Sequence, residues 1–222
     1  MSSTLIQLLV LAGIAIFLIL KLRNVLGTRE GFEKPPARAP GPNRASGNGR
    51  GGFEVIEGGP DADITDHVPE GSESARALAA MKTIESDFGV GEFLSGAGGA
   101  YEMIVMAFER GEIDNIRPFL SDDVHATFAE VVAERERQEL KVEARFVGLR
   151  EVSLVEAEFD RDDREAEITV RFLGELTSAV YDKAGRVVEG NATEVKRQKD
   201  IWTFARVMGS ADPNWRLVAT GD

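Results

Sequence analysis

The sequence has no cysteine and only two histidines, His67 and His125, among its 222 residues. The absence of cysteine excludes disulfides and thiolate metal sites. The two histidines lie far apart in different segments of the chain, which argues against a histidine-based metal site or catalytic triad. We therefore expect no metal site and no cofactor.

Basic side chains are in the minority, with 26 Lys and Arg against 38 Asp and Glu and a formal net charge of −12. Residues 1–52 hold seven basic and two acidic side chains, which is +5, so the remainder carries −17. This anionic body repels phosphate backbones and anionic headgroups, which argues against nucleic acid as a partner. Only the basic linker described below is expected to contact anionic lipid.

Polar side chains are absent from Leu5–Leu20 except for Gln7. The uncharged stretch before Lys21, at about 1.5 Å per helical residue, is long enough to cross a hydrocarbon core of roughly 30 Å. No basic residue precedes it and no small-residue cleavage site follows it, which disfavours a cleaved signal peptide. The sequence therefore predicts a transmembrane anchor over 1–26 that contacts the membrane through residues 1–20. By the positive-inside rule, the N-terminus is exported and the body stays in the cytoplasm.

Gly, Pro and Arg are frequent in residues 27–71, which lack apolar periodicity. Such a composition buries too little apolar surface to offset the entropy of ordering, so we predict a disordered linker. Its 44 or so residues of random coil have an r.m.s. span of roughly 35–40 Å. Phe53, Val55 and Ile56 form an apolar patch within it. This patch is either a loose hydrophobic contact or a partner-binding motif.

Helical periodicity begins at Ser72, a fair helix cap, and continues to Phe88. The predicted stripe consists of residues spaced by four and three: Ala77, Met81, Ile84 and Phe88. This segment is a candidate for a membrane-proximal helix. Its acidic residues outnumber its basic ones, whereas membrane-surface helices favour Lys and Arg, so packing on the body or on a partner is favoured.

Three further helical segments are expected, over Phe93–Gly111, over Ile113–Leu120 and from Ser121 onward. Gly111 is a plausible stop, and the Ser121 hydroxyl can cap the third segment. The first contains a glycine-rich stretch around Gly98. It has no GxxxxGK[ST] and no complete GxGxxG motif, which argues against a phosphate cradle. The small residues instead allow another backbone to approach closely.

After Leu140 the apolar period changes to two. Two strands are predicted where apolar and charged residues alternate: Val142, Ala144 and Phe146 in the first, and Ile168, Val170 and Phe172 in the second. A third strand is predicted near Val195–Met208 and a fourth over Trp215–Ala219. Helices followed by antiparallel strands indicate an α+β domain over 72–222, with helices covering one face of the sheet.

Two blocks at the ends of this predicted domain resemble the C-terminal domain of the Tim-forty-four family. They are "FLSGAGGAYEMIVMAFERG" followed by "IRPFLSDDV", and "DIWTFARVMGSADPNWRLVAT". The resemblance covers roughly residues 74–220. That family includes the motor-docking subunit of the mitochondrial inner-membrane presequence translocase and the TimA-type adaptors of alphaproteobacteria. The resemblance implies a cone-shaped fold similar to nuclear transport factor two, with helices on a curved antiparallel sheet around a large apolar pocket.

In the mitochondrial relatives, this domain meets the cardiolipin-rich inner membrane and the translocation channel through helices that correspond to residues 72–88 here. The mitochondrial subunit also has a long N-terminal region that recruits the Hsp70 machinery. This chain has a predicted span and linker instead, so chaperone docking is not carried over. The absence of a basic amphipathic presequence favours a bacterium. Together with the predicted span and its orientation, this predicts a single-pass protein of the bacterial inner membrane with a cytoplasmic C-terminal domain.

A span, a long tether and a domain without a catalytic cluster together predict a non-enzymatic adaptor. It would bind protein partners or client polypeptides at the cytoplasmic membrane face, in protein translocation or membrane-protein biogenesis. The predicted pocket residues are aromatic: Tyr101, Phe146, Phe172, Trp202 and Trp215. A cavity rimmed by them would bury apolar ligand surface, although most of these rings are expected to fill the core.

Two alternatives stay open. One is a small-molecule-binding protein or isomerase-type enzyme of the same cone fold, with Asp200 and either Tyr101 or Tyr181 as base and donor. The basic residues just before Asp200 favour instead an ion pair at the surface. The other alternative is a ribosome tether, because a mitochondrial ribosomal protein shares the domain. The −17 charge of the body makes contact with rRNA unfavourable.

Overall fold

The computed structural model describes residues 61–221, so the predicted anchor over 1–26 lies outside the described residues. Nine elements follow one another within that range: α2 (Ala62–Thr65), α3 (Glu73–Ile84), α4 (Val90–Arg110), the 3-10 helix η1 (Ile113–Phe119), α5 (Asp122–Arg137), β1 (Lys141–Phe159), β2 (Glu165–Tyr181), β3 (Val187–Val207) and β4 (Arg216–Gly221). None of the helices in this range is long and apolar enough to cross a lipid bilayer.

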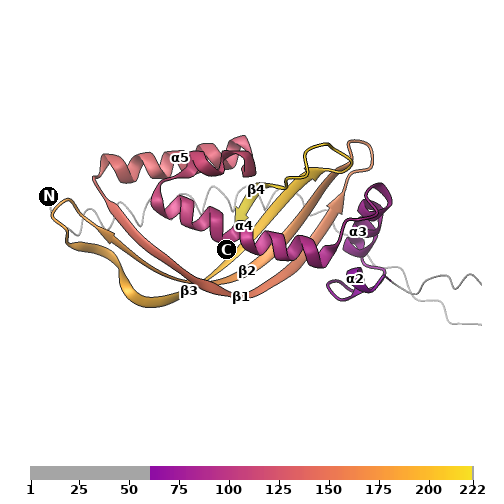
Figure 1. The fold of residues 1–222 in the computed structure, drawn as a ribbon, viewed down its shortest axis with the longest axis horizontal. Helices are drawn as coiled ribbons and strands as arrows, with labels where there is room; N and C mark the ends of the chain where they lie inside the picture. Colours follow the sequence, from indigo (N-terminus) through magenta and orange to yellow (C-terminus); the bar gives the residue numbers. More distant parts are fainter. Residues whose placement is uncertain (1–60, 222) are drawn as a thin grey trace, which may run out of the picture. The chain divides into compact units, whose positions relative to one another are not determined.

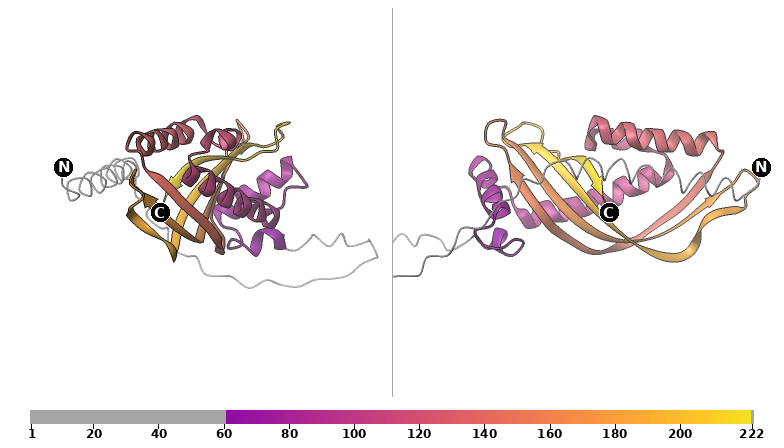
Figure 2. Two further views of the ribbon diagram at one scale, coloured as in Figure 1. Left: turned by 60° about the vertical axis from the view of Figure 1, so that its left-hand side comes forward. Right: turned by 180° about the vertical axis from the view of Figure 1, so that it is seen from behind.

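The four strands form one antiparallel sheet in the order β1-β2-β3-β4. The sheet is long and strongly curved, and α4 and α5 lie on the same side of it (Figure 1). The other views place α2 and α3 together at one end of the strands (Figure 2). The predicted α+β class, with helices packed on an antiparallel sheet, is confirmed.

The core lies between α4 and the central strand β2. Along β2, every second residue from Ala166 to Phe172 is fully buried, as the period of two requires. These side chains meet the buried face of α4, which includes Phe93, Tyr101 and Ile104. The other face of β2 is covered by no helix in the described part of the chain, and its side chains are mostly half-buried.

The helix ends follow the predicted capping chemistry. Ser72 and Ser121 each accept a backbone N–H of the first turn through the side-chain hydroxyl, at 3.1 and 3.3 Å. Gly111 ends α4 in the left-handed conformation with φ 74°. That conformation is adopted readily by glycine because it has no Cβ.

The strand β3 begins at Val187, earlier than the predicted start at Val195. Asp182 closes the turn that precedes it by accepting backbone N–H groups of Ala184 and Arg186 through its carboxylate. The hairpin therefore continues toward its tip although every residue from 187 to 199 is exposed. A strand exposed on both faces shows no alternation of apolar and polar residues, so the pattern misses it.

The predicted stripe on the first helix is only partly correct. The buried face of α3 consists of Ala75, Leu78 and Met81, and Ala77 is half-buried beside it. Ile84 is 40% exposed at the last turn. Phe88 lies beyond the end of the helix, where its ring packs 6.4 Å from Phe93 and 6.0 Å from Trp215.

The helix α3 is held against the end of β1. The Ser74 hydroxyl accepts the backbone N–H of Ala157 at 3.0 Å, which covers an amide at the outer edge of β1. At the other end of α3, Glu85 accepts the backbone N–H of Gly209 at 2.6 Å and forms an ion pair with Arg206. The carboxylate thereby links the end of the helix to the end of β3 and the loop after it.

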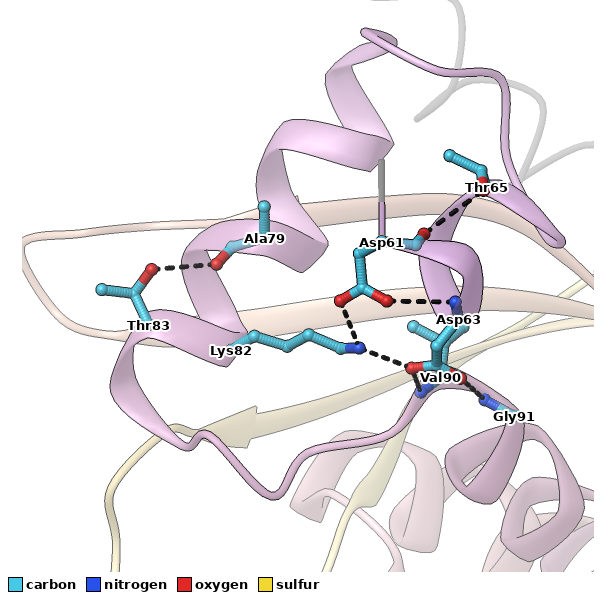
Figure 3. A network of polar contacts seen from close by, with 8 residues as sticks. All are labelled: Asp61, Asp63, Thr65, Ala79, Lys82, Thr83, Val90 and Gly91. Carbon is cyan, nitrogen blue, oxygen red and sulfur yellow. Dashed lines mark hydrogen bonds and ion pairs between the residues drawn. The ribbon is translucent and has the colours of Figure 1, made fainter. Parts of the chain in front are cut away.

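The segment before α3 is ordered from Asp61 onward, so the predicted linker is wrong for residues 61–71. Asp63 accepts the backbone N–H groups of Val90 and Gly91, at 2.7 and 3.0 Å, and thus caps the start of α4 (Figure 3). Lys82 of α3 donates to both Asp61 and Asp63 at 2.7 Å. Composition cannot reveal contacts that join three segments far apart in the sequence.

Candidate partner-binding groove

A groove of about 570 Å³ runs between α4 and the edge strand β1. Its lining is mainly apolar and small, with one carboxylate and one imidazole: His67, Leu94, Ser95, Gly98, Gly99, Glu102, Phe146, Val147, Gly148, Leu149 and Val152. The groove is open to solvent along the exposed face of α4, where Ser95, Gly99 and Glu102 lie.

Small residues on α4 create this groove. A Cβ at Gly98 would lie 3.2 Å from Leu149 Cδ1, so β1 approaches the helix closely there, as the glycine-rich sequence predicts. A Cβ at Gly99 would have no heavy atom within 4 Å. The groove therefore has a tight floor at Gly98 and open space above Gly99.

Irregular pairing of β1 shapes the opposite wall. The register between β1 and β2 shifts between Phe146 and Gly148 and again between Leu149 and Glu151. Such bulges turn side chains away from strict alternation. Val147 is 50% exposed beside Phe146, which packs against the core, and both residues line the groove.

Four of the five predicted aromatic residues gather behind this groove. The Tyr101 ring stacks on Phe172 at 4.6 Å and lies 4.7 Å from Trp202 and 6.1 Å from Phe146. Trp215 lies apart from them, 4.7 Å from Phe93. Phe146 is the member of the predicted set that lines the groove. The other rings form packed core, and a role for the set in binding stays a prediction.

The predicted surface position of Asp200 is wrong, because its side chain is 7% exposed and faces the core. It shares a strand face with Trp202, and its carboxylate accepts the Tyr101 hydroxyl at 2.5 Å and the Gln198 side chain at 3.1 Å. Burial and the bond to Asp200 raise the pKa of Tyr101 well above its ordinary value. Tyr181, at the far end of β2 opposite Val187, is not brought to this pair.

The pair of Tyr101 and Asp200 depends on Gly174 of β2. A Cβ at Gly174 would lie 2.8 Å from the Tyr101 hydroxyl oxygen, so only glycine leaves room for the ring. Neither Tyr101 nor Asp200 lines the groove. The hydrogen bond therefore joins α4 to β3 inside the core.

Sequence reasoning missed most of the groove lining. The sequence did contain a signal for the irregular wall of β1. The alternation of apolar and charged residues is interrupted there by four consecutive uncharged residues: Phe146, Val147, Gly148 and Leu149. A run of this kind with a glycine is typical of a β-bulge. The position of His67 in the groove lining was not predicted, because that residue was assigned to the linker. Within residues 61–221, no cluster of three or more His, Asp and Glu side chains is arranged to hold a metal ion.

Comparison with known proteins identifies the family of this chain. No curated protein matches the chain. Among solved structures, the crystal structure of the intermembrane space region of the chloroplast protein ARC6 is similar over 94% of its own chain and 56% of this one. The identity is 15% and the TM-score 0.37, values too low to carry an argument. The profile of the Tim44-like domain matches residues 74–222, which is more than half of the chain, and the protein belongs to the Tim44-like domain family.

Proposed function

We propose that this protein is a non-enzymatic adaptor that holds an apolar segment of a partner or client polypeptide in the groove between α4 and β1. The Tim44-like family is associated with protein translocation, and membership is consistent with an adaptor without catalytic activity. The observation that carries the proposal is the open, mainly apolar groove on the exposed side of α4. Its space above Gly99 can receive a side chain from another molecule.

The chemistry of the groove favours an apolar segment with basic flanks. Leu94, Leu149 and Val152 offer apolar contact, and Glu102 supplies a carboxylate at the exposed side. The formal charge of −12 adds long-range attraction for basic sequences. Burying apolar ligand surface against a lining of this small extent, at about 25 cal/mol per Å², yields only about 2 kcal/mol before association costs. Binding is therefore weak and reversible, as an adaptor that releases its client requires.

The proposal includes the predicted anchor over residues 1–26, which would keep the domain at the cytoplasmic face of a bacterial inner membrane. The apolar run and the basic residues after it support this placement. A random-coil tether over residues 27–60, as their composition predicts, would have an r.m.s. span of roughly 30–35 Å. The basic residues of that tether are proposed to contact anionic lipid.

The test is photo-crosslinking of the full chain in intact cells, with a photoreactive amino acid at Val147. Val155 is a matched control, because it lies on the same strand and is 48% exposed against 50% for Val147, but does not line the groove. We expect Val147 to capture polypeptides that Val155 does not. Recovery of small metabolites alone at Val147, or identical products at both positions, would refute the adaptor proposal.

A further inference from the structure

The sheet face opposite α4 carries a buried carboxylate, that of Glu175 in β2. Phe172 of the same strand is buried toward α4, so strand alternation places Glu175 on the other face. Its side chain is only 7% exposed. Arg150 of β1 contacts Oε2 at 2.8 Å, and Arg197 of β3 contacts Oε1 at 3.1 Å. One carboxylate therefore fixes two guanidinium groups that come from the strands on either side of it.

Both arginines keep donors that a ligand can use. The side chains of Arg150 and Arg197 are 63% and 71% exposed, and each contacts Glu175 through Nε. Within residues 61–221, their terminal Nη groups donate to no other protein group. The planar pair of Nη donors matches the two oxygens of a carboxylate. Because Glu175 already holds each guanidinium in place, less side-chain freedom is lost when an anion binds.

The charge around these arginines is positive. Lys199 is exposed on the same face of β3, two residues after Arg197, and forms no ion pair within the described residues. The neighbouring Arg171 pairs with Glu151 at 2.8 Å and adds no net charge. Two arginines and one lysine against the carboxylate of Glu175 leave a local charge of +2.

The same face also offers apolar surface. In the described part of the chain, no helix covers it (Figure 1). Leu173 lies on it, half-buried, two residues before Glu175 and opposite Lys199. The cations therefore border an apolar side chain, and the face fits a ligand that combines acidic groups with an apolar one.

Long-range charge favours a short segment over a broad anionic surface. Residues 53–222 carry −17, since the chain carries −12 and residues 1–52 carry +5. A membrane or a nucleic acid approaches over a wide area and is repelled by this charge. Screening limits such effects to about 8 Å at physiological salt, so a short acidic segment responds mainly to the local +2. A second copy lying face to face would place the same cations against each other, which is unfavourable.

We propose that Arg150, Arg197 and Lys199 bind an acidic segment of a partner protein on this open face of the sheet. Glu175 holds the two arginines in place, and Leu173 contacts an apolar side chain of the segment. This surface goes beyond the proposed client site, because the groove lies on the side of the sheet that α4 covers. One domain can therefore hold a client in the groove and an acidic partner on the opposite face at the same time.

The test is fluorescence anisotropy with the full chain in mild detergent at about 0.15 M salt. The probe is a dye-labelled peptide with Glu on both sides of a Leu, and its counterpart has Gln in place of each Glu. We expect only the acidic peptide to bind. Arg197→Gln should weaken its binding about tenfold, because charge-assisted hydrogen bonds are lost.

Arg161→Gln is the matched control for this charge change. Arg161 is exposed in the turn between β1 and β2, roughly 30 Å along the strand from Glu175 and well beyond the screening length. We expect it to weaken binding less than twofold. Equal weakening by Arg197→Gln and Arg161→Gln, or equal binding of the acidic peptide and its Gln counterpart, overturns the proposal.

Two further variants separate recognition by the arginines from attraction by charge. Lys199→Gln leaves both contacts of Glu175 intact and should weaken binding about threefold. Arg197→Lys keeps the charge but lacks the planar pair of donors, and should also weaken binding about threefold. Wild-type affinity in either variant overturns the proposal. Tryptophan fluorescence of each variant verifies that the fold is retained.

Competition identifies any other occupant of this face. If micelles that carry phosphatidylglycerol displace the acidic peptide at a lower concentration than the unlabelled peptide does, the site binds a lipid headgroup and the proposal is overturned. If size-exclusion chromatography shows a dimer that Arg197→Gln dissociates, a second copy is the occupant, which overturns it as well. Gly99→Leu fills only the groove and should keep wild-type affinity for the acidic peptide, so failure of this proposal and failure of the client proposal are distinguishable.

Discussion

The carboxylate of Asp63 should stabilise the domain measurably, because it joins α2 to both α3 and α4. It accepts hydrogen bonds from the backbone N–H groups of Val90 and Gly91 at the start of α4. It also forms an ion pair with Lys82 of α3 (Figure 3). The N-cap residue of α4 is Gly89, which supplies no side-chain cap of its own. Replacing Asp63 by alanine removes the cap of a 21-residue helix and leaves Lys82 with Asp61 alone.

The magnitude follows from the pKa of Asp63. Burial raises this pKa, but the bond from Lys82 and the N–H groups of Gly91 and Val90 outweigh burial and lower it from 3.8 to about 2. At about 1.36 kcal/mol per pKa unit, the difference between these two pKa values corresponds to roughly 2.4 kcal/mol of unfolding free energy. Since 33% of the side chain is exposed, screening by water reduces this value. We expect Asp63→Ala to cost about 1–2 kcal/mol, in the range of a lost N-cap.

The pH dependence has a definite sign. A carboxylate with a lowered pKa in the folded state stabilises fully above its unfolded value, here 3.8, and loses this effect as the pH falls through about 2. The difference in unfolding free energy between wild type and Asp63→Ala should therefore be full at pH 6 and small near pH 2. The difference in unfolding free energy that remains at low pH measures the hydrogen bonds that the protonated Asp63 carboxyl still makes.

The assay is thermal unfolding of the full chain in mild detergent, followed by tryptophan fluorescence at several pH values. A loss of 1–2 kcal/mol should lower Tm by about 2–8 °C for a domain of this size. Asp66→Ala is the matched control, since it removes the same charge from the same segment and Asp66 is exposed. If Asp63→Ala and Asp66→Ala have the same Tm, or if the effect of Asp63→Ala does not change with pH, the reasoning is refuted.

Three further predictions concern the groove and the sheet. Gly99→Leu should abolish binding of an apolar, basic-flanked peptide, measured by fluorescence anisotropy, because the new side chain fills the groove. Gly96→Leu is the control, since a Cβ there also meets no neighbour but lies outside the groove, and this variant should bind the peptide as wild type does. Gly174→Ala should cost about 1–3 kcal/mol in urea unfolding because its Cβ would meet the Tyr101 hydroxyl, and adding Tyr101→Phe should recover part of this loss. Glu175→Gln should lower Tm at pH 7, with a smaller effect below pH 4.5, because hydrogen bonds from two arginines lower the pKa of this carboxyl.

Local sequence features predicted the elements well where each is determined by its own residues. The caps at Ser72, Ser121 and Gly111 are recognised from single residues next to apolar stripes. The strands β1 and β2 are recognised from their period of two. The family blocks likewise lie in segments that contribute to the core, with Tyr101 in α4, Trp202 in β3 and Leu217 in β4.

Contacts between distant segments were not predictable in this way. Residues 61–71 have a linker-like composition, yet Asp63 contacts α3 and α4 and Ile64 is buried. Asp200 follows three basic or amide residues in sequence, which suggested a surface position. Its side chain faces inward because strand alternation places it with Trp202 and Phe204. The groove also depends on two elements that are about fifty residues apart, and no local pattern reports their approach.

The two polar contacts in the middle of the sheet have a common consequence for β3. From 187 to 199 this strand is exposed throughout, so its register with β2 is specified by apolar burial only further along the same ladder, at Trp202 and Phe204. Asp200 bonds Tyr101 on the face toward α4, and Arg197 bonds Glu175 on the opposite face. A slip by one residue would exchange the faces and break both contacts. These contacts therefore add to the burial of Trp202 and Phe204 in holding the pleat of Lys196–Asp200 in one register.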